Sequence, residues 1–254
     1  MLENEIKKTL AADEIKLPEI VKLLLDLKME FNLNETNTDD ILRTLRLDND
    51  QAVKERDYLY KRLIEYTNKC NNCMLCTLET HTQKVPGEGA LNSPLVLIGE
   101  GPGFDEDKEG RPFVGKAGKL LTTILDKLNV SREKVYITNV IKCRPPQNRT
   151  PLQKEIKACS HILELELSII QPKVIIALGA VPFNYFKPGS SIMKERGQWI
   201  NVRDYWIMPT FHPAYILRQG GKALTQVKWL VWSDFNKALE KAKELCPEYN
   251  YADP

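Results

Sequence analysis

The stretch PLVLIGEGPG at residues 94–103 decides the class of fold. A short apolar run that ends in glycines is typical of a strand buried on both faces and followed by a tight turn. Three more such runs follow at residues 134–143, 172–180 and 205–213, and helix-length segments such as residues 117–130 and 151–171 separate them. This alternation predicts an α/β fold: a three-layer α/β/α sandwich around a central four-stranded parallel sheet.

The region before these strands has a different composition. Residues 1–65 are rich in Lys, Glu, Asp and Leu, contain no glycine, and show helical spacing in LPEIVKLLLDLKMEF at residues 17–31. We therefore expect a helical N-terminal extension over residues 1–65, one domain over residues 66–246, and a tail over residues 247–254. The extension is interpreted either as a solvated helical arm or small helical domain, or as a segment that docks a partner.

Net charge, hydropathy and cysteine content limit the classes of protein to which the chain can belong. The 254-residue chain has a net charge of only +2, so a nucleic-acid surface would have to be local. It has no apolar run long enough to span a membrane, and its N-terminus lacks an apolar signal core, so we expect a cytoplasmic protein. Three of its six cysteines lie in CNNCMLC at residues 70–76, which favours metal binding over disulfides.

Unusual residues follow each predicted strand. Glu100 lies among glycines, Asn139 ends the second strand, and His212 follows the last one. Phe113 lies in the glycine-flanked turn GRPFVG at residues 110–115. Because parallel strands carry ligand sites at their carboxyl ends, these side chains predict one crevice with a stacking aromatic and an amide suited to a pyrimidine edge. Each also has an ordinary structural explanation: a tight turn, a core aromatic, a turn cap.

Basic residues accompany the same segments. The stiff loop KCRPPQNRTP, residues 142–151, supplies Lys142, Arg144 and Arg149, which suit phosphate contacts. In FHPAYILR, residues 211–218, the run from Tyr215 to Leu217 and the following Arg218 are interpreted as an apolar wedge beside a cation, or else as a partly buried helix start.

Taken in order, GEGPGFDEDKEGRPFVGKAG, TNVIKCRPPQNRTP, LGAVP, KERGQW and FHPAYILR resemble the family 4 uracil-DNA glycosylases, the iron–sulfur type of bacteria and archaea. The resemblance implies an enzyme that flips uracil out of DNA, hydrolyses its N-glycosidic bond and leaves an abasic site, without a lyase step. It implies catalytic Glu100 and His212 and substrate contacts from Gly101, Glu106, Phe113 and Asn139. DNA contacts would come from Lys142, Arg144, Arg149, Arg196, Tyr215, Ile216, Leu217 and Arg218.

The roles of the acids stay open at this stage. The resemblance favours Glu100 as the group that activates water, but Glu106 and Asp107 lie close in sequence. Glu106 is expected near uracil C5, where a thymine methyl must be rejected.

The resemblance also implies a structural 4Fe-4S cluster held by Cys70, Cys73, Cys143 and Cys159. Spacing alone leaves a four-cysteine zinc site open, and Cys76 is an alternative to Cys70 in the first pair. The expected partner is uracil-containing DNA, bound by a monomer, and the N-terminal extension is a candidate docking segment for a repair or replication partner. A non-catalytic binder of uracil-containing DNA and a protein that captures it covalently are the alternatives. The second is disfavoured because GFDEDKEGRPF, residues 103–113, carries no histidine-containing insertion.

Overall fold

The computed structural model describes residues 50–252, except residues 72, 78–80 and 203. The predicted helical extension lies outside the described residues up to residue 49. From there the chain forms helix α4 (Asp50–Lys69), which packs against α8 (Gln153–Ile170), and the short helix α5 (Met74–Thr77) follows. The division of the chain at residue 65 remains a prediction.

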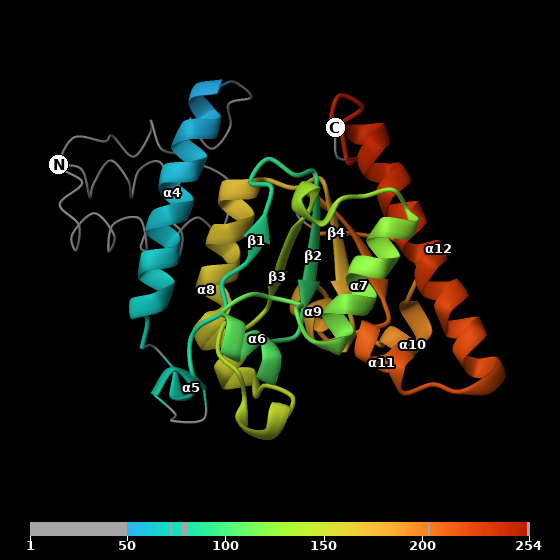
Figure 1. The fold of residues 1–254 in the computed structure, drawn as a ribbon, viewed down its shortest axis with the longest axis horizontal. Coiled ribbons are helices and arrows are strands. Elements are labelled where there is room, and N and C mark those ends of the chain that lie inside the picture. The colour runs from blue at the N-terminus through green and yellow to red at the C-terminus, as the bar shows by residue number, and fades with distance from the viewer. Residues whose placement is uncertain (1–49, 72, 78–80, 203, 253–254) are drawn as a thin grey trace.

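A mixed sheet lies at the centre of the protein (Figure 1). Its six strands follow the order β1-β3-β2-β4-β6-β5. The four predicted parallel strands are confirmed as β2 (Leu95–Gly99), β3 (Tyr136–Asn139), β4 (Val174–Leu178) and β6 (Tyr205–Thr210). Two short antiparallel strands, β1 (Glu88–Gly89) and β5 (Ile200–Val202), extend the two edges.

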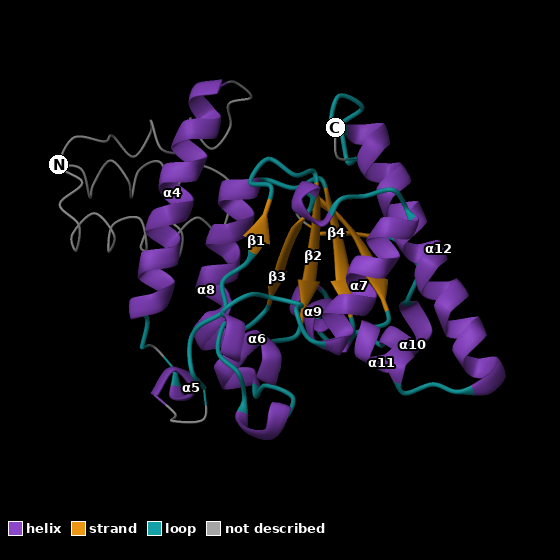
Figure 2. Cartoon of the chain, in the orientation of Figure 1, coloured by secondary structure: helices purple, strands orange, loops and turns teal. Residues whose placement is uncertain are grey.

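Helices cover both faces of this sheet (Figure 2). One hydrophobic core contains Val96 and Ile98 of β2 together with residues of α4, α8 and α9 (Ala180–Phe186). The other contains Leu95 and Leu97 with residues of α7 (Lys116–Lys127), α11 (Pro213–Leu217) and α12 (Gly221–Leu245). Successive residues of a strand point to opposite faces, so a continuous apolar strand supplies both cores. The three-layer α/β/α sandwich is therefore confirmed.

The remaining elements are short. They are helices α6 (Phe104–Glu109) and α10 (Ile192–Glu195) and the 3₁₀ turns η1 (Arg132–Lys134) and η2 (Pro146–Asn148). None of the helices in the described part of the chain is long and apolar enough to cross a membrane.

The strand register brings the chemically distinctive residues together. Gly99 at the end of β2 pairs with Asn139 at the end of β3, and Leu178 at the end of β4 pairs with Thr210 at the end of β6. All four strands run in the same direction, so the segments that follow them leave the sheet at one edge.

Candidate active site

A pocket of about 590 Å³ opens at this edge. Three of the parallel strands lead into it: Glu100 follows β2, Asn139 ends β3, and His212 follows β6. Gly179, which follows β4, lies against His212 but does not line the pocket. The residues singled out from the sequence that line the pocket are Glu100, Gly101, Glu106, Phe113, Asn139, Arg149, His212, Leu217 and Arg218.

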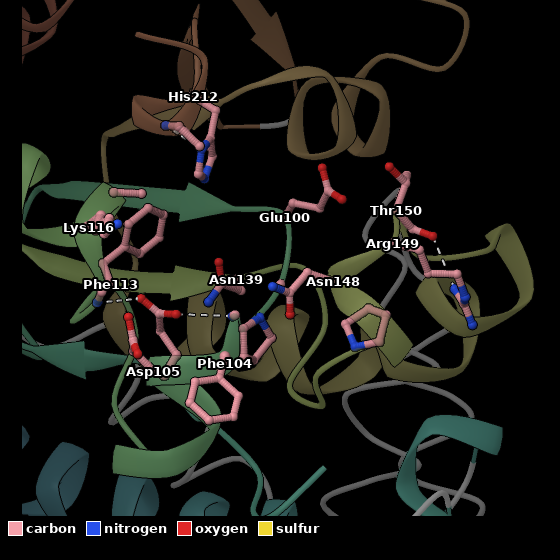
Figure 3. A pocket seen from close by; sticks show the side chains of 18 of the residues that line it. Glu100, Phe104, Asp105, Phe113, Lys116, Asn139, Asn148, Arg149, Thr150 and His212 are labelled. Carbon is pink, nitrogen blue, oxygen red and sulfur yellow. Dashed lines mark hydrogen bonds between the residues drawn. The ribbon is translucent and has the colours of Figure 1, made fainter. Parts of the chain in front are cut away.

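Asn139 lies at the base of the pocket and is almost fully buried (Figure 3). Its Oδ1 atom is buried and has no hydrogen-bond partner among the described residues. A buried polar atom without a partner is destabilising by roughly 1–3 kcal/mol, so such an atom in a pocket is a candidate for contact with a bound ligand.

Gly99 explains how Asn139 and Phe113 come close to the sheet. A Cβ atom at this glycine would lie 2.4 Å from Asn139 Oδ1 and 2.5 Å from Phe113 Cζ. Both contacts are shorter than real Cβ atoms tolerate, so only glycine leaves room for the amide and the ring to sit side by side on the strand end.

The Phe113 ring forms an aromatic wall with His212. The ring centroids lie 5.6 Å apart with planes inclined by 31°. Phe113 has a φ of 53°, a left-handed conformation that non-glycine residues rarely adopt. Strained backbone of this kind accumulates at binding and catalytic sites, which agrees with a ring held for stacking rather than for core packing alone.

The tautomer of His212 follows from one hydrogen bond. The Ala214 N–H donates to His212 Nδ1 at 3.1 Å, so a neutral ring carries its proton on Nε2. Burial, with the nearby positive charge of Arg218, lowers the pKa of His212 from 6.5 to about 4. At neutral pH the pocket therefore contains an uncharged imidazole whose Nε2–H is available as a donor.

Glu100 is the carboxylate at the end of the central strand. Burial raises the pKa of its carboxyl group above the ordinary value, and a hydrogen bond with Thr150 offsets part of the rise. No arginine or lysine forms a salt bridge with it among the described residues, so its charge remains uncompensated in the pocket wall. Such a carboxylate is suited to accept a proton or to stabilise a developing cation.

Glu106 braces the turn that carries Phe113. Its Oε1 atom accepts hydrogen bonds from the backbone N–H groups of Val114 at 3.0 Å and Gly115 at 2.8 Å. Its Oε2 atom accepts one from Gly103 N–H at 3.1 Å. Since the carboxylate is held by three backbone donors, it shapes the pocket wall, and Glu100 is the better placed of the two acids to act as a base.

The prediction that Lys142 contacts DNA is wrong. The side chain is completely buried, and Nζ donates to Thr138 Oγ1, Asn139 O and Glu166 Oε2, each at 2.7 Å. All three protons of the ammonium group thus have acceptors inside the protein. The loop sequence suggested an exposed basic residue, whereas the chain turns this side chain toward the interior.

The prediction that Ile216 contacts DNA is also wrong. Ile216 is only 1% exposed and belongs to the core against α7 and α12. Arg196 pairs with the buried Asp234 through Nε at 3.0 Å and Nη2 at 2.5 Å, and it does not line the pocket. Its contact with DNA stays a prediction.

The other predicted contacts remain near the pocket mouth. Leu217 and Arg218 are exposed, and Tyr215 is half-buried with its ring 4.7 Å from that of Phe211. Arg149 forms a bidentate pair with Glu155, at 2.6 and 2.8 Å. Arg144 lies outside the pocket lining, over the ring of Phe104.

Several pocket residues were not found from the sequence. Phe104, Asp105 and Lys116 lie within the glycine-rich stretch of residues 99–118, where the glycines, Glu100 and Phe113 gave the stronger signal. Thr150 forms a hydrogen bond with Glu100. The only feature of the sequence that pointed to Thr150 was its position directly after the basic Arg149. The fold brings it to Glu100 from a segment fifty positions away, which local sequence patterns do not reveal.

Cysteines from three segments converge beside α8. Cys76 Sγ lies 3.5 Å from Cys73 Sγ and 3.8 Å from Cys143 Sγ. Burial raises the pKa of Cys159 to about 12, and Cys73 and Cys76 lie close enough to contribute to that rise. Cys70 is buried and contacts Cys76.

These contacts favour Cys76 over Cys70 as the partner of Cys73. No group of three or more Cys, His, Asp or Glu side chains in the described part of the chain has the spacing of a metal site.

Comparisons with known proteins agree with this geometry. The family model of the uracil DNA glycosylase superfamily matches residues 86–236, the segment that holds the parallel strands and the pocket. The type-4 uracil-DNA glycosylase of Thermotoga maritima is 45% identical over 188 residues, covering 72% of this chain and 94% of the relative.

Two archaeal relatives carry the same name. The type-4 uracil-DNA glycosylase of Sulfurisphaera tokodaii is 41% identical, covering 72% of this chain and 84% of the relative. That of Pyrobaculum aerophilum is 50% identical over 58% of this chain and 81% of the relative. The chain therefore belongs to the uracil DNA glycosylase superfamily, in its type-4 family.

Proposed function

We propose that the protein removes uracil from DNA by hydrolysing the N-glycosidic bond, which releases free uracil and leaves an abasic site. The observation that carries this proposal is the buried Oδ1 of Asn139, which lies beside the Phe113 ring and has no hydrogen-bond partner among the described residues. An amide can accept from uracil N3–H through Oδ1 and donate to O4 through Nδ2. Cytosine presents the reverse pattern at these two positions, so the amide discriminates between the two bases.

The pocket is suited to a base taken out of the helix. A nucleobase inside a duplex is inaccessible to Glu100 and His212, so the uracil must first leave the stack. Phe113 would stack on the flipped ring, while the turn braced by Glu106 would close the pocket at the C5 edge, where thymine carries its methyl group. The exposed Leu217 would occupy the space that the base vacates.

Bond cleavage develops negative charge on the leaving uracil and positive charge on the sugar. The neutral His212 can donate its Nε2–H to uracil O2 as that charge grows, a type of contact worth about 10²–10³ in rate. Glu100 can orient a water molecule, accept its proton, and stabilise the cationic sugar. This scheme gives Lys116, a lysine of the pocket lining, no covalent role, so we expect the abasic strand to be left intact.

We also infer that the converging thiols hold a metal cofactor, a 4Fe-4S cluster bound by Cys73, Cys76, Cys143 and Cys159. The donor set fits, since Cys76 contacts the thiols of Cys73 and Cys143, and soft thiolates select iron–sulfur clusters or zinc. Such a group would link the segment around α5 to the loop after β3. Metal analysis and the visible absorption spectrum of the purified protein separate the cluster from zinc.

The direct test uses a labelled oligonucleotide with one uracil and a matched oligonucleotide with thymine. After incubation with the protein and treatment with alkali, a denaturing gel should show cleavage at uracil only. Tight binding without cleavage would replace the glycosylase by a uracil-DNA binding protein. A protein–DNA band that survives denaturation would indicate covalent capture instead.

A further inference from the structure

An exposed aromatic side chain lies at the rim of the pocket. Phe104 begins α6, lines the pocket, and is 59% exposed. In the view of Figure 3 it lies on the opposite side of Asn139 from His212. The proposed base recognition and bond cleavage do not use this ring, so its exposure at the mouth of a pocket needs another explanation.

A guanidinium group accompanies the ring. The Cζ atom of Arg144 lies 5.0 Å from the centroid of the Phe104 ring, within the range of a cation–π contact. The arginine is itself oriented, because its Nε donates to Asn148 Oδ1 at 2.6 Å. The loop between β3 and α8 therefore holds a positive charge against an exposed aromatic face.

Two segments of the pocket lining combine an exposed apolar side chain with an arginine. Phe104 lies beside Arg144, and Leu217, which is 51% exposed, is followed by the exposed Arg218. A DNA strand that places one base in the pocket would bring its neighbouring phosphates near these cations. Leu217 is aliphatic and suits filling of a gap, whereas Phe104 offers a flat face for stacking.

We propose that Phe104 and Arg144 form a second DNA subsite, in which Phe104 stacks on a nucleobase adjacent to the flipped uracil. This inference rests on the proposed function, because it takes the uracil to lie in the pocket. A base neighbouring the uracil is free to stack on Phe104 in single-stranded DNA, whereas in a duplex it stays paired and stacked. The subsite therefore favours uracil in single-stranded or locally opened DNA.

The test compares two rim variants on two substrates. Phe104→Ala should lower kcat/KM on single-stranded uracil DNA by about tenfold, the loss expected for one stacked base, with a much smaller effect on a U·G duplex. Leu217→Ala should show the opposite preference, because a single strand has no base stack to fill. Phe104→Trp should retain the single-strand activity.

Tyr58→Ala is the matched control, because Tyr58 is an aromatic residue of α4 that is 50% exposed and does not line the pocket. A second readout needs no hydrolysis: binding of uracil-free oligo(dT), where Phe104→Ala should also weaken affinity. Equal kinetics of Phe104→Ala and Tyr58→Ala on single strands, or equal losses on both substrates, would overturn the subsite. Failure of the wild-type protein to release uracil, with oligo(dT) affinity still dependent on Phe104, would instead overturn the proposed function.

Discussion

Lys142 Nζ lies 2.7 Å from Glu166 Oε2, and both side chains are only 1% exposed. The pair connects several parts of the site. Lys142 also binds the backbone oxygen of Asn139, and Glu166 Oε1 accepts from Gly87 N–H at 2.9 Å. The backbone N–H of Lys142 donates to Cys159 Sγ at 3.3 Å. One buried ion pair thus fixes the end of β3 between the pocket and the thiols.

Removing one member of this pair should destabilise the fold strongly. Lys142→Met leaves the Glu166 carboxylate buried without its counter-charge, and such losses reach about 3–5 kcal/mol. Urea-induced unfolding measures the change. Glu244→Ala, which removes the Lys241–Glu244 pair at its exposed member, should change stability by less than about 1 kcal/mol. Similar losses in the two variants would show that the buried network is unimportant.

Glu100→Gln should lose most activity and become more stable at neutral pH. Burial raises the pKa of Glu100, so between its ordinary pKa of 4.5 and the raised value the folded protein binds more protons than the unfolded one. Ionised Glu100 therefore destabilises the fold as pH rises, and the amide removes this effect. Thermal unfolding at pH 7 measures the predicted gain in stability, and uracil-release rates measure the predicted loss of activity. A variant that is both active and less stable would contradict the assignment.

The contribution of His212 to stability should change with pH in the opposite direction to that of Glu100. Its pKa of about 4 lies below the unfolded value of 6.5, so the unfolded chain binds the extra proton and stability falls as pH decreases from 6.5 to 4. The shift corresponds to roughly 3 kcal/mol. His212→Gln should remove this dependence and lower the rate by about 10²–10³. His81 lies outside the pocket, so His81→Ala should retain both the pH dependence of stability and the wild-type rate. An unchanged pH profile of stability in His212→Gln would refute the buried neutral imidazole.

Asn139→Asp should weaken discrimination between uracil and cytosine. An ionised aspartate cannot donate to uracil O4 but can accept from cytosine N4–H, so kcat/KM on uracil should fall roughly 10- to 100-fold relative to the value on cytosine. Rates on U·G and C·G duplexes give the ratio. Asn236→Asp, on the outer part of α12, serves as the surface control. Retention of the wild-type ratio would remove Asn139 from base recognition.

Cys76→Ser should lose the bound metal, whereas Cys70→Ser should retain it. Cys76 contacts both Cys73 and Cys143, and Cys70 contacts Cys76. Iron, sulfide and zinc contents of the two purified variants, with their visible spectra, decide the ligand set. The reverse result would restore the ligand pair that the sequence favoured.

The sequence by itself determined the framework of the site. Continuous apolar runs alternating with helix-length segments specified parallel strands covered on both faces, since only such strands bury every residue. Parallel strands share one carboxyl edge, so Glu100, Asn139 and His212 had to meet there. These conclusions depend on periodicity and strand direction, which are local properties of the chain.

Only the tertiary structure decided which neighbouring side chains are exposed near the pocket and which are buried. Ile216 and Leu217 are adjacent in α11, where consecutive residues point about 100° apart, and packing against α7 and α12 buries the first and exposes the second. Lys142 turns inward because Glu166, on the distant helix α8, supplies its counter-charge. Cys76 joins Cys143 because of where α5 lies beside the loop after β3. Each outcome depends on contacts between segments far apart in sequence, which local pattern and composition do not encode.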